Sequence, residues 1–478
     1  MTRYIKTFTT PGGNYVYDRE VNSLLSVSNK EEFESFKRIE QGMDTDKDWL
    51  LLNRYAKQGY LKETSLKEIV HPATPYLKFH LTKHVSQLTL QVTQQCNLNC
   101  SYCIYSGSYE NQRTHGDKKM PLDIMQRSVD FVMERSTGAK DLILGFYGGE
   151  PLIEIENIKK CVEYVEKNYG DRSISYTVTT NGTLFADEVV QFLDDKKFSV
   201  MISFDGPKDL HDQNRVFHDG RGSFDVIIDN IKKIKEKYPI FFKRIVFMST
   251  VAPGTDLACV NDYFEADDIL SDTMVTRNIV SPYSAKEEIV YDDLYGITDT
   301  YQHMKVLLAA LGIYSKNKIS KLYSTSLTEA EVFYLGLSKT GIFEKYHPSG
   351  PCLPGVLRPF VDIAGNIFPC ERVGEGSELM KIGHIDTGYD IDKADAVLNV
   401  GRLTEAECKK CWNFLHCGLC VSACEGEKEF SRERRLKNCK ISMNNTLNSL
   451  KIICLLLENG YDFELERAVK EGVELNYA

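Results

Sequence analysis

The side chains with the clearest chemical potential in this sequence are cysteines. Three of them share one short window, as Cys96, Cys100 and Cys103, separated by three and then two residues. Three thiolates on one tight loop can bind three irons of a [4Fe–4S] cluster and leave the fourth iron free to bind another molecule. A zinc site is the alternative, and it needs a fourth ligand, for which His115 is the only local candidate.

A second cysteine group lies nearer the C-terminus. It consists of Cys352, Cys370, Cys408, Cys411, Cys417, Cys420, Cys424 and Cys439. A reducing cytosol disfavours disulfides, so metal binding is the natural role for so many thiols. A zinc ribbon would also fit the two pairs that are separated by two residues. The isolated Cys161, Cys259 and Cys454 are predicted to be small buried core residues.

Composition restricts the class of protein. The chain has 478 residues, of which 42% are hydrophobic, and a formal net charge of -10. It can therefore bury a sizeable core in two or three domains. The acidic balance argues against a nucleic-acid partner, since phosphate binding needs a clustered basic surface. We find no signal peptide and no apolar run of membrane-spanning length, so a cytoplasmic protein with no membrane partner is expected.

The middle of the chain alternates between apolar strands and amphipathic helices. Such alternation predicts an α/β fold with a parallel sheet, and six units suggest an open, partial (β/α)6 TIM barrel. Chemistry is expected at the C-terminal ends of its strands. The predicted strands are 87–93, 141–147, 173–180, 198–204, 243–251 and 273–281.

The segment before the barrel has a different pattern. Residues 14–28 predict two strands around a polar turn, followed by helices at about 30–41 and 46–57 and an extended piece from residue 59. A hairpin with short helices suggests a winged-helix-like module. Its open sheet edge could bind an extended peptide by strand addition. A purely structural N-terminal cap is the alternative.

Four domains follow from these patterns. They are an N-terminal module (1–85), the partial barrel (86–315), a helical bridge (316–349) and a cysteine-rich domain (350–478). Helices are expected at about 299–345 and 441–470. The loop-rich stretch at 350–445 has little regular apolar pattern, so bound metal is expected to stabilise it.

The first cysteine motif, C-x3-C-x2-C after a strand, resembles the signature of the radical S-adenosylmethionine (SAM) superfamily. This resemblance implies that the free iron binds SAM and that reduction cleaves SAM to a 5′-deoxyadenosyl radical. Further segments resemble those enzymes in the same order, namely GGEP, TNGT and S-x-DG, each after a strand. The SAM-binding residues implied by the resemblance are Tyr102, Gly148, Gly149, Glu150, Pro151, Asn181, Ser203, Asp205 and Arg215.

The C-terminal cysteines resemble the SPASM extension of radical SAM enzymes, which binds two auxiliary [4Fe–4S] clusters. By analogy, Cys352, Cys370 and either Cys420 or Cys424 bind the first cluster, which then keeps an open iron for a substrate thiolate. Cys408, Cys411, Cys417 and Cys439 bind the second. The spacing around Cys420 and Cys424 departs from the usual pattern, so the choice between them stays open. Three clusters and SAM are therefore the expected cofactors.

The N-terminal module resembles elements that bind the leader of a ribosomally made precursor peptide. We therefore expect a peptide maturase, and the Cys411-Trp412 region resembles maturases that form thioether links between cysteine sulfur and carbon. An external reductant such as flavodoxin or ferredoxin is implied. Alternatives are C–C or C–O cross-linking, epimerisation, and formylglycine formation by a sulfatase-maturing enzyme. A non-catalytic zinc or electron-transfer scaffold is the alternative outside enzymes.

Overall fold

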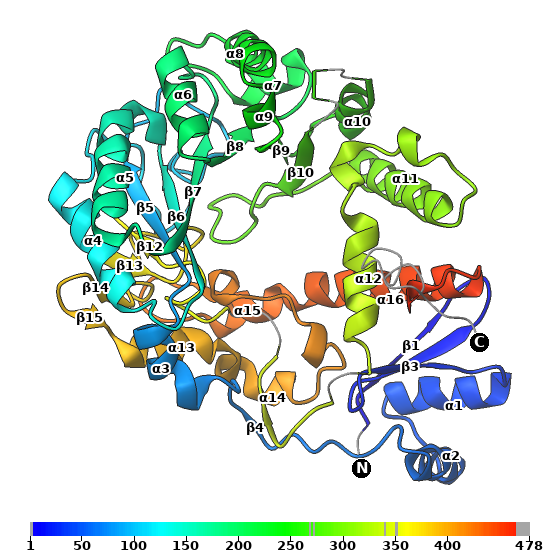
Figure 1. Ribbon diagram of the computed structural model, residues 1–478. Coiled ribbons are helices and arrows are strands. Elements are labelled where there is room, and N and C mark those ends of the chain that lie inside the picture. The colour runs from blue at the N-terminus through cyan, green and yellow to red at the C-terminus, as the bar shows by residue number, and fades with distance from the viewer. Residues whose placement is uncertain (1–2, 267–268, 271–272, 339–340, 349–351, 465–478) are drawn as a thin grey trace, which may run out of the picture.

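The computed structural model describes residues 3–266, 269–270, 273–338, 341–348 and 352–464. Its main element is a ten-stranded sheet with strand order β10-β9-β8-β7-β6-β5-β12-β13-β14-β15. The strands from β5 to β10 run parallel and curve into an open half-barrel (Figure 1), which confirms the predicted partial barrel. They are β5 (Gln87–Thr93), β6 (Asp141–Gly148), β7 (Ser173–Thr180), β8 (Ser199–Ser203), β9 (Ile245–Val251) and β10 (Met274–Ile279).

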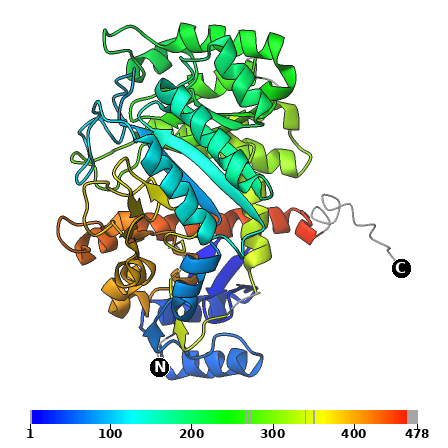
Figure 2. The ribbon, with the colours of Figure 1, turned by 60° about the vertical axis from the view of Figure 1, so that its left-hand side comes forward.

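Helices cover the outer face of this sheet (Figure 2). α8 is typical, because its isoleucines at 227, 231 and 234 recur on one face and are buried against the strands. β5 is buried along almost its whole length, as expected of a strand covered on both faces. The helices between strands are α4 (Leu122–Glu134), α5 (Ile155–Tyr169), α6 (Asp187–Asp195), α7 (Lys208–Asn214), α8 (Phe224–Lys237), α9 (Pro239–Phe242) and α10 (Leu257–Ala266).

The cysteine-rich region continues the barrel sheet, which the sequence did not predict. β12 (Phe360–Val361) pairs in parallel with β5, and β13 (Asn366–Phe368), β14 (Gly383–His384) and β15 (Gly388–Tyr389) follow in antiparallel order. Its apolar side chains join the barrel core. The cysteine-rich region therefore folds on an apolar core that it shares with the barrel. The helices here are α13 (Ile391–Leu398), α14 (Glu405–Cys408) and α15 (Arg432–Lys437).

The N-terminal module is a three-stranded antiparallel sheet with two helices. The predicted hairpin forms as β2 (Asn14–Asp18) and β3 (Ser23–Ser26), and the predicted helices form as α1 (Lys30–Glu40) and α2 (Asp46–Lys57). The sequence analysis missed β1 (Ile5–Thr9), whose short polar–apolar run precedes a Pro-Gly-Gly turn. After residue 59 the next described strand is the short β4 (Glu68–Ile69), which pairs with β11 (Lys345–Tyr346).

Three further helices connect the ends of the molecule. α11 (Asp293–Ala310) and α12 (Ser326–Gly336) account for the predicted helical bridge, and α16 (Cys439–Glu458) for the predicted last helix. α16 runs below the open side of the half-barrel to the N-terminal sheet, where the Tyr15 hydroxyl donates to Glu458 at 2.7 Å. The remaining short helix is α3 (Leu77–Lys83). The predicted end of the last helix at residue 470 lies outside the described residues.

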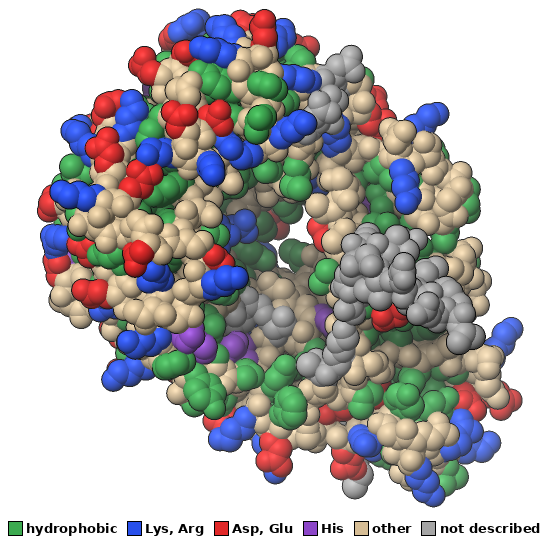
Figure 3. Space-filling model, in the orientation of Figure 1, with side chains coloured by type: hydrophobic (Ala, Val, Ile, Leu, Met, Phe, Trp, Pro, Cys, Tyr) green, Lys and Arg blue, Asp and Glu red, His purple; other side chains and the backbone are tan. Residues whose placement is uncertain are grey.

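The space-filling view shows a deep hollow between the half-barrel and the lower part of the molecule (Figure 3). The C-terminal ends of the barrel strands and the cysteine-rich loops are the segments that approach it in the ribbon view. Within the described ranges, no helix has both the length and the apolar character needed to cross a membrane.

Candidate active site

The loop that carries the first three cysteines follows β5 directly. Two backbone hydrogen bonds fix it to the segment after α7: Asn99 N donates to Val216 O at 2.7 Å, and Ser101 N donates to Asn214 O at 3.0 Å. Because these bonds involve main-chain atoms, they define the course of the loop whatever the side chains are. The loop is thus preorganised at the C-terminal edge of the sheet.

The three cysteines of this loop are half-buried. Leu98 N donates to Cys96 Sγ at 3.5 Å, and Tyr105 N donates to Cys103 Sγ at 3.4 Å. Burial raises the pKa of Cys96 to about 12 and that of Cys100 to about 11, with a smaller contribution from neighbouring thiols. Thiols in this environment become thiolates only when a cation binds them, and iron suits such soft ligands. The donor set therefore fits an iron–sulfur cluster.

The structure also bears on the zinc alternative. Within the described residues, no three His, Cys, Asp or Glu side chains converge on a point that could hold a single metal ion. The thiolates of a [4Fe–4S] cluster bind different irons, so they need not converge in this way. His115 Nε2 lies 3.7 Å from Cys103 Sγ, as a hydrogen-bond partner of that sulfur.

The two glycines after β6 let two stretches of backbone meet. A Cβ on Gly148 would lie 2.3 Å from Thr93 O, and one on Gly149 would lie 2.0 Å from Gln95 O. Gly148 also has a φ of 142°, which side chains rarely permit. In this structure the glycines allow the end of β6 to pack against the strand that leads to Cys96. The contact of both glycines with SAM, which the resemblance implies, stays a prediction.

Glu150 is buried, with 1% of its surface exposed. Its carboxylate accepts hydrogen bonds from the Thr180 hydroxyl (2.7 Å), Asn181 N (2.7 Å) and Leu152 N (3.1 Å). Burial raises its pKa to about 7. Glu150 therefore links the ends of β6 and β7, while its contact with the SAM amino group stays a prediction. Pro151 begins the short helix that Glu150 caps.

The end of β7 is tied to the cysteine loop by amide side chains. Asn181 Nδ2 donates to Asn97 Oδ1 at 2.8 Å, and Asn97 Nδ2 donates to the Thr183 hydroxyl at 2.8 Å. Sequence analysis singled out Asn181 but missed Asn97, although it lies inside the cysteine motif. Ser203 ends β8 and is half-buried.

Asp205 joins several predicted site residues. Its carboxylate accepts hydrogen bonds from the Tyr102 hydroxyl, from Arg215 Nε (2.9 Å) and from Thr250 N (3.0 Å). The Arg215 guanidinium also lies 5.3 Å from the centre of the Tyr102 ring, with Nη1 4.0 Å from Cys100 Sγ. The structure thus brings Tyr102, Asp205 and Arg215 together beside the cysteine loop.

His211 supports this group from behind and was not singled out in the sequence. It is fully buried; Asp205 N donates to its Nδ1 at 3.3 Å, and its Nε2 lies 2.9 Å from the Ser223 hydroxyl. That hydroxyl donates to Arg215 O at 2.8 Å, so Nε2 carries the proton. Burial lowers the pKa of His211 to about 4, which keeps the ring neutral. A neutral histidine thereby positions both members of the Asp205–Arg215 pair.

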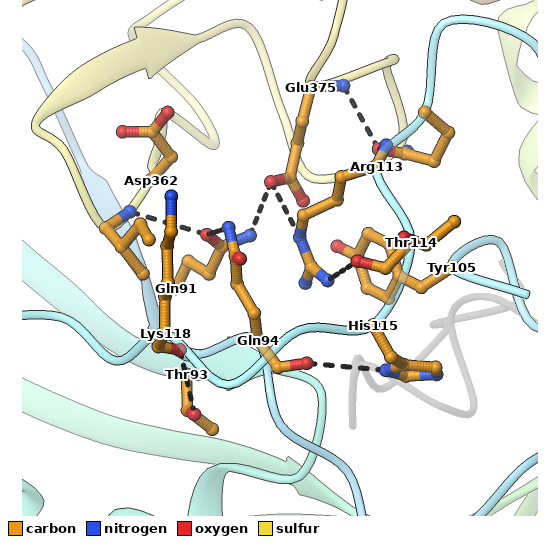
Figure 4. Close-up of polar contacts among 12 residues, drawn as sticks. Gln91, Thr93, Gln94, Tyr105, Arg113, Thr114, His115, Lys118, Asp362 and Glu375 are labelled. Carbon is orange, nitrogen blue, oxygen red and sulfur yellow. Dashed lines mark hydrogen bonds and ion pairs between the residues drawn. The ribbon is translucent and has the colours of Figure 1, made fainter. Parts of the chain in front are cut away.

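A polar cluster joins the first cysteine loop to the loop after Cys370 (Figure 4). Gln91 Nε2 and Arg113 Nε both donate to Glu375 Oε2, at 2.5 and 2.9 Å. The Arg113 guanidinium stacks 3.6 Å from the centre of the Tyr105 ring. These contacts fix the position of one cysteine loop relative to the other, and no motif in the sequence indicated them.

Four of the C-terminal cysteines line one cavity of about 50 Å³: Cys408, Cys411, Cys417 and Cys439. Burial, with smaller contributions from the other three thiols of the cavity, raises the pKa of Cys411 to about 12. These are the four residues assigned by resemblance to one auxiliary cluster. The cavity thus brings together four thiols, the number of ligands that such a cluster takes.

A second set contains Cys370, Cys420 and Cys424. Burial is the main cause that raises the pKa of Cys370 and of Cys424 to about 12, and the Cys420 thiol makes a smaller contribution in both cases. The choice between Cys420 and Cys424 as a cluster ligand stays a prediction. Cys352 is exposed in this structure.

The isolated cysteines behave as predicted with one exception. Cys161 and Cys454 are buried in apolar clusters. The prediction for Cys259 was wrong, because it lies on the exposed face of α10, where Leu257 and Val260 take the buried positions.

Comparison with known families decides the nature of the three-cysteine site. Residues 90–265 match the family model of the radical SAM superfamily. The chain contains a radical SAM domain. Radical SAM enzymes use SAM and a [4Fe–4S] cluster, and the matched segment contains Cys96, Cys100, Cys103 and the Asp205–Arg215 pair. The half-barrel, with helices on its outer face, is the fold that positions them.

Two curated relatives are cysteine-type anaerobic sulfatase-maturating enzymes. The enzyme from Clostridium novyi is 32% identical over 170 residues, which are 35% of this chain and 44% of that enzyme. The enzyme from Clostridium perfringens is 25% identical over 360 residues, which are 73% of this chain and 91% of that enzyme. This chain thus covers less than half the length of the first relative and most of the length of the second.

A solved structure shares the fold. Native anSMEcpe with bound AdoMet and the Cp18Cys peptide has 20% sequence identity and a TM-score of 0.51, covering 76% of this chain and 99% of that one. At this identity the likeness concerns the fold alone. About a quarter of the present chain has no counterpart in that structure.

Proposed function

We propose that this radical SAM enzyme is a maturase that modifies a ribosomally made precursor peptide by closing thioether links. The observation that carries the proposal is the combination of the three-cysteine loop with an N-terminal sheet that has an exposed strand edge. Relatives that mature a protein substrate, and a fold shared with a peptide-bound enzyme, support a peptide as the partner.

The residues proposed to hold SAM and its cluster lie around the loop after β5. Cys96, Cys100 and Cys103 would bind the cluster, and Arg215, held by Asp205, would face the SAM carboxylate or ribose. The bound cofactors supply a 5′-deoxyadenosyl radical that removes hydrogen from a substrate carbon, with the electron delivered by an external reductant such as flavodoxin or ferredoxin. The chain itself orients the cofactor and keeps water from the loop.

We assign the auxiliary clusters by the two sets of thiols. Cys408, Cys411, Cys417 and Cys439 would hold one cluster in their shared cavity. Cys370, Cys420 and Cys424 would hold the other, with Cys352 as the fourth ligand. This assignment uses both Cys420 and Cys424, so it closes the cluster that the usual pattern would leave with an open iron.

The peptide-binding edge is proposed to be β3. Val27 N donates to Asn14 O, and pairs alternate in an antiparallel ladder, so Leu24 and Ser26 direct their main-chain groups away from β2. Ser26 is exposed. An extended peptide could therefore add a fourth strand along residues 24–26.

The opposite edge of this sheet is less suited. On β1, the outward Thr7 N donates to the Glu40 carboxylate at 2.8 Å, and Lys6 pairs with the same group. This side chain takes the place that a peptide carbonyl would occupy. A purely structural cap would not need to leave a strand edge exposed. Leader recognition at β3 accounts for this exposed edge.

Formylglycine formation is the second candidate, favoured by the names of the two relatives. The two reactions treat sulfur differently. Thioether formation keeps the cysteine sulfur and removes two hydrogens per link. Formylglycine formation from cysteine removes the sulfur and leaves an aldehyde. Other cross-links and epimerisation would leave cysteine thiols free.

The deciding experiment is anaerobic co-expression with a cysteine-rich peptide encoded beside this chain. We expect the peptide mass to fall by two hydrogens per link and its thiols to resist alkylation. A chain with Cys96, Cys100 and Cys103 replaced by Ala is the control and should yield unmodified peptide and no 5′-deoxyadenosine. An aldehyde that reacts with a hydrazide reagent would replace the thioether proposal with the second candidate.

A further inference from the structure

Arg435, on α15, is buried, although most of its guanidinium has no hydrogen-bond acceptor. Its exposed fraction is 1%. Nε donates to the Thr404 hydroxyl at 3.1 Å, but the buried Nη1 and Nη2 have no hydrogen-bond partner in the described residues. A buried cation with unpaired donors costs several kcal/mol unless an anion compensates it. Arg435 therefore calls for an anionic partner beyond the residues of the chain.

The cavity with the four thiols is where the guanidinium lies. Arg435 lines it together with Cys408, Cys411, Cys417 and Cys439. The Thr404 hydroxyl that accepts from Arg435 is also 3.2 Å from Cys408 Sγ. Side chain and thiols thus meet on the cavity wall.

The same arginine faces the other thiol set. Ser431 caps the start of α15, and its backbone N donates to Cys424 O at 2.7 Å, so the helix lies directly beside the Cys424 turn. Arg435 N donates to Ser431 O at 3.2 Å, and Cys439 Sγ lies 3.6 Å from Arg435 O. Arg435 is therefore close to thiols of both sets.

Two carboxylates lie near Arg435 without pairing with it. Glu407 also lines the cavity; its Oε1 pairs with Arg432, and its buried Oε2 has no hydrogen-bond partner among the described residues. Glu425, beside Cys424, accepts from Gly374 N at 3.2 Å. Neither carboxylate forms an ion pair with Arg435 among the described residues.

We propose that Arg435 is a shared positioning cation that lies between the two auxiliary cluster sites and donates Nη1 and Nη2 toward sulfur on both sides. The inference rests on the proposed auxiliary clusters. An iron–sulfur cluster with thiolate ligands is anionic and gains a further negative charge on reduction. A buried cation stabilises the reduced form more than the oxidised form, so Arg435 raises both reduction potentials together.

The test is an EPR-monitored redox titration of the reconstituted full chain and three variants. Arg435→Met removes the charge at similar bulk, Arg435→Lys keeps it, and Lys437→Met removes an equal charge from the exposed face of the same helix. At the native midpoint of each auxiliary cluster, we expect Arg435→Met to lower the ratio of reduced to oxidised cluster about tenfold. A tenfold change in this ratio corresponds to a shift of about 59 mV in the reduction potential for one electron. Arg435→Lys should recover most of it, and Lys437→Met should match the native chain.

Iron content completes the test. If Arg435→Met loses the iron of both auxiliary sites while Arg435→Lys and Lys437→Met retain it, the shared cation is supported as a requirement for assembly. A shift confined to one cluster, unchanged potentials in Arg435→Met, or an equal shift in Lys437→Met would overturn it. A native chain that binds only the iron of one cluster would instead refute the proposed auxiliary clusters.

Discussion

At the level of single residues, Asp205 has the most consequential contacts. It accepts from Tyr102, Arg215 and a backbone amide, and it is itself nearly buried. A charge-assisted hydrogen bond holds a long side chain in one orientation that solvent would otherwise randomise. The geometry of Arg215 beside Cys100 thus depends on Asp205, which lies ten residues before Arg215 in the sequence.

Replacing Asp205 by Asn should weaken SAM binding without removing the cluster. The neutral amide keeps the size of the side chain but loses the ion pair with Arg215, and such bonds contribute about 1.5–3 kcal/mol. We expect the Kd for SAM, measured by equilibrium dialysis on the reconstituted protein, to rise roughly tenfold or more. The exposed Asp209→Asn on α7 is the matched control and should leave the Kd unchanged; an unchanged Kd in Asp205→Asn as well would show that Arg215 does not contact SAM.

At the level of elements, the site depends on how β5, β6 and β7 end at one edge. Gly148 and Gly149 allow the β6 end to approach Thr93 and Gln95, and Glu150 then reaches across to β7. Parallel strands place their carboxyl ends at the same edge, so motifs far apart in sequence meet there. The N-terminal sheet differs, because the outer edge of β3 pairs with no other strand of the described residues.

The β3 edge can be tested with one substitution. Ser26→Pro removes an outward N–H that β2 does not use, so the ladder between β2 and β3 is kept while strand addition loses a donor. We expect modification of the leader-containing peptide to fall at least severalfold, with SAM cleavage in the absence of peptide unchanged. Ser26→Ala keeps the N–H and should behave as the native chain. Full peptide modification by Ser26→Pro would place the leader elsewhere.

At the level of the whole molecule, the N-terminal module packs directly against the loop that carries Cys411. Arg19 is fully buried, and its Nη1 donates to Lys409 O at 2.7 Å and Cys411 O at 3.2 Å. His416 Nε2 lies 2.8 Å from Asn22 Oδ1 at the same contact. Deleting the module would therefore expose the loop of the second cluster as well as remove the peptide edge, so a truncation cannot isolate leader recognition.

A point substitution tests this contact. Arg19→Met leaves two loop carbonyls without their donor, and we expect iron to be lost severalfold faster from the Cys408–Cys439 site when a chelator is added. The loss can be followed by absorbance and iron analysis. Arg54→Met, which removes an exposed ion pair with Glu32 on the same module, should release iron at the native rate. Equal rates in both variants would contradict a structural link between module and cluster.

The sequence determined the local features of this protein. Six runs rich in Val, Ile, Leu, Phe or Thr predicted the barrel strands, because β-branched and aromatic side chains fit a pleated, half-buried surface. The cysteine spacing predicted the cluster loop, since ligands to one cluster have to lie on one tight turn. The hairpin and both N-terminal helices followed from turn residues and from three-to-four-residue periodicity.

Only the tertiary structure decided which distant residues meet. The cavity that Arg435 shares with four cysteines and the contact of Arg19 with the Cys411 loop join segments that share no pattern in the chain. β12 to β15 are too short for their apolar residues to predict strands, yet they extend the barrel sheet because β5 offers a free edge for pairing. The local sequence pattern reflects the burial of each residue, whereas the contacts between distant residues depend on how the whole chain packs around its core.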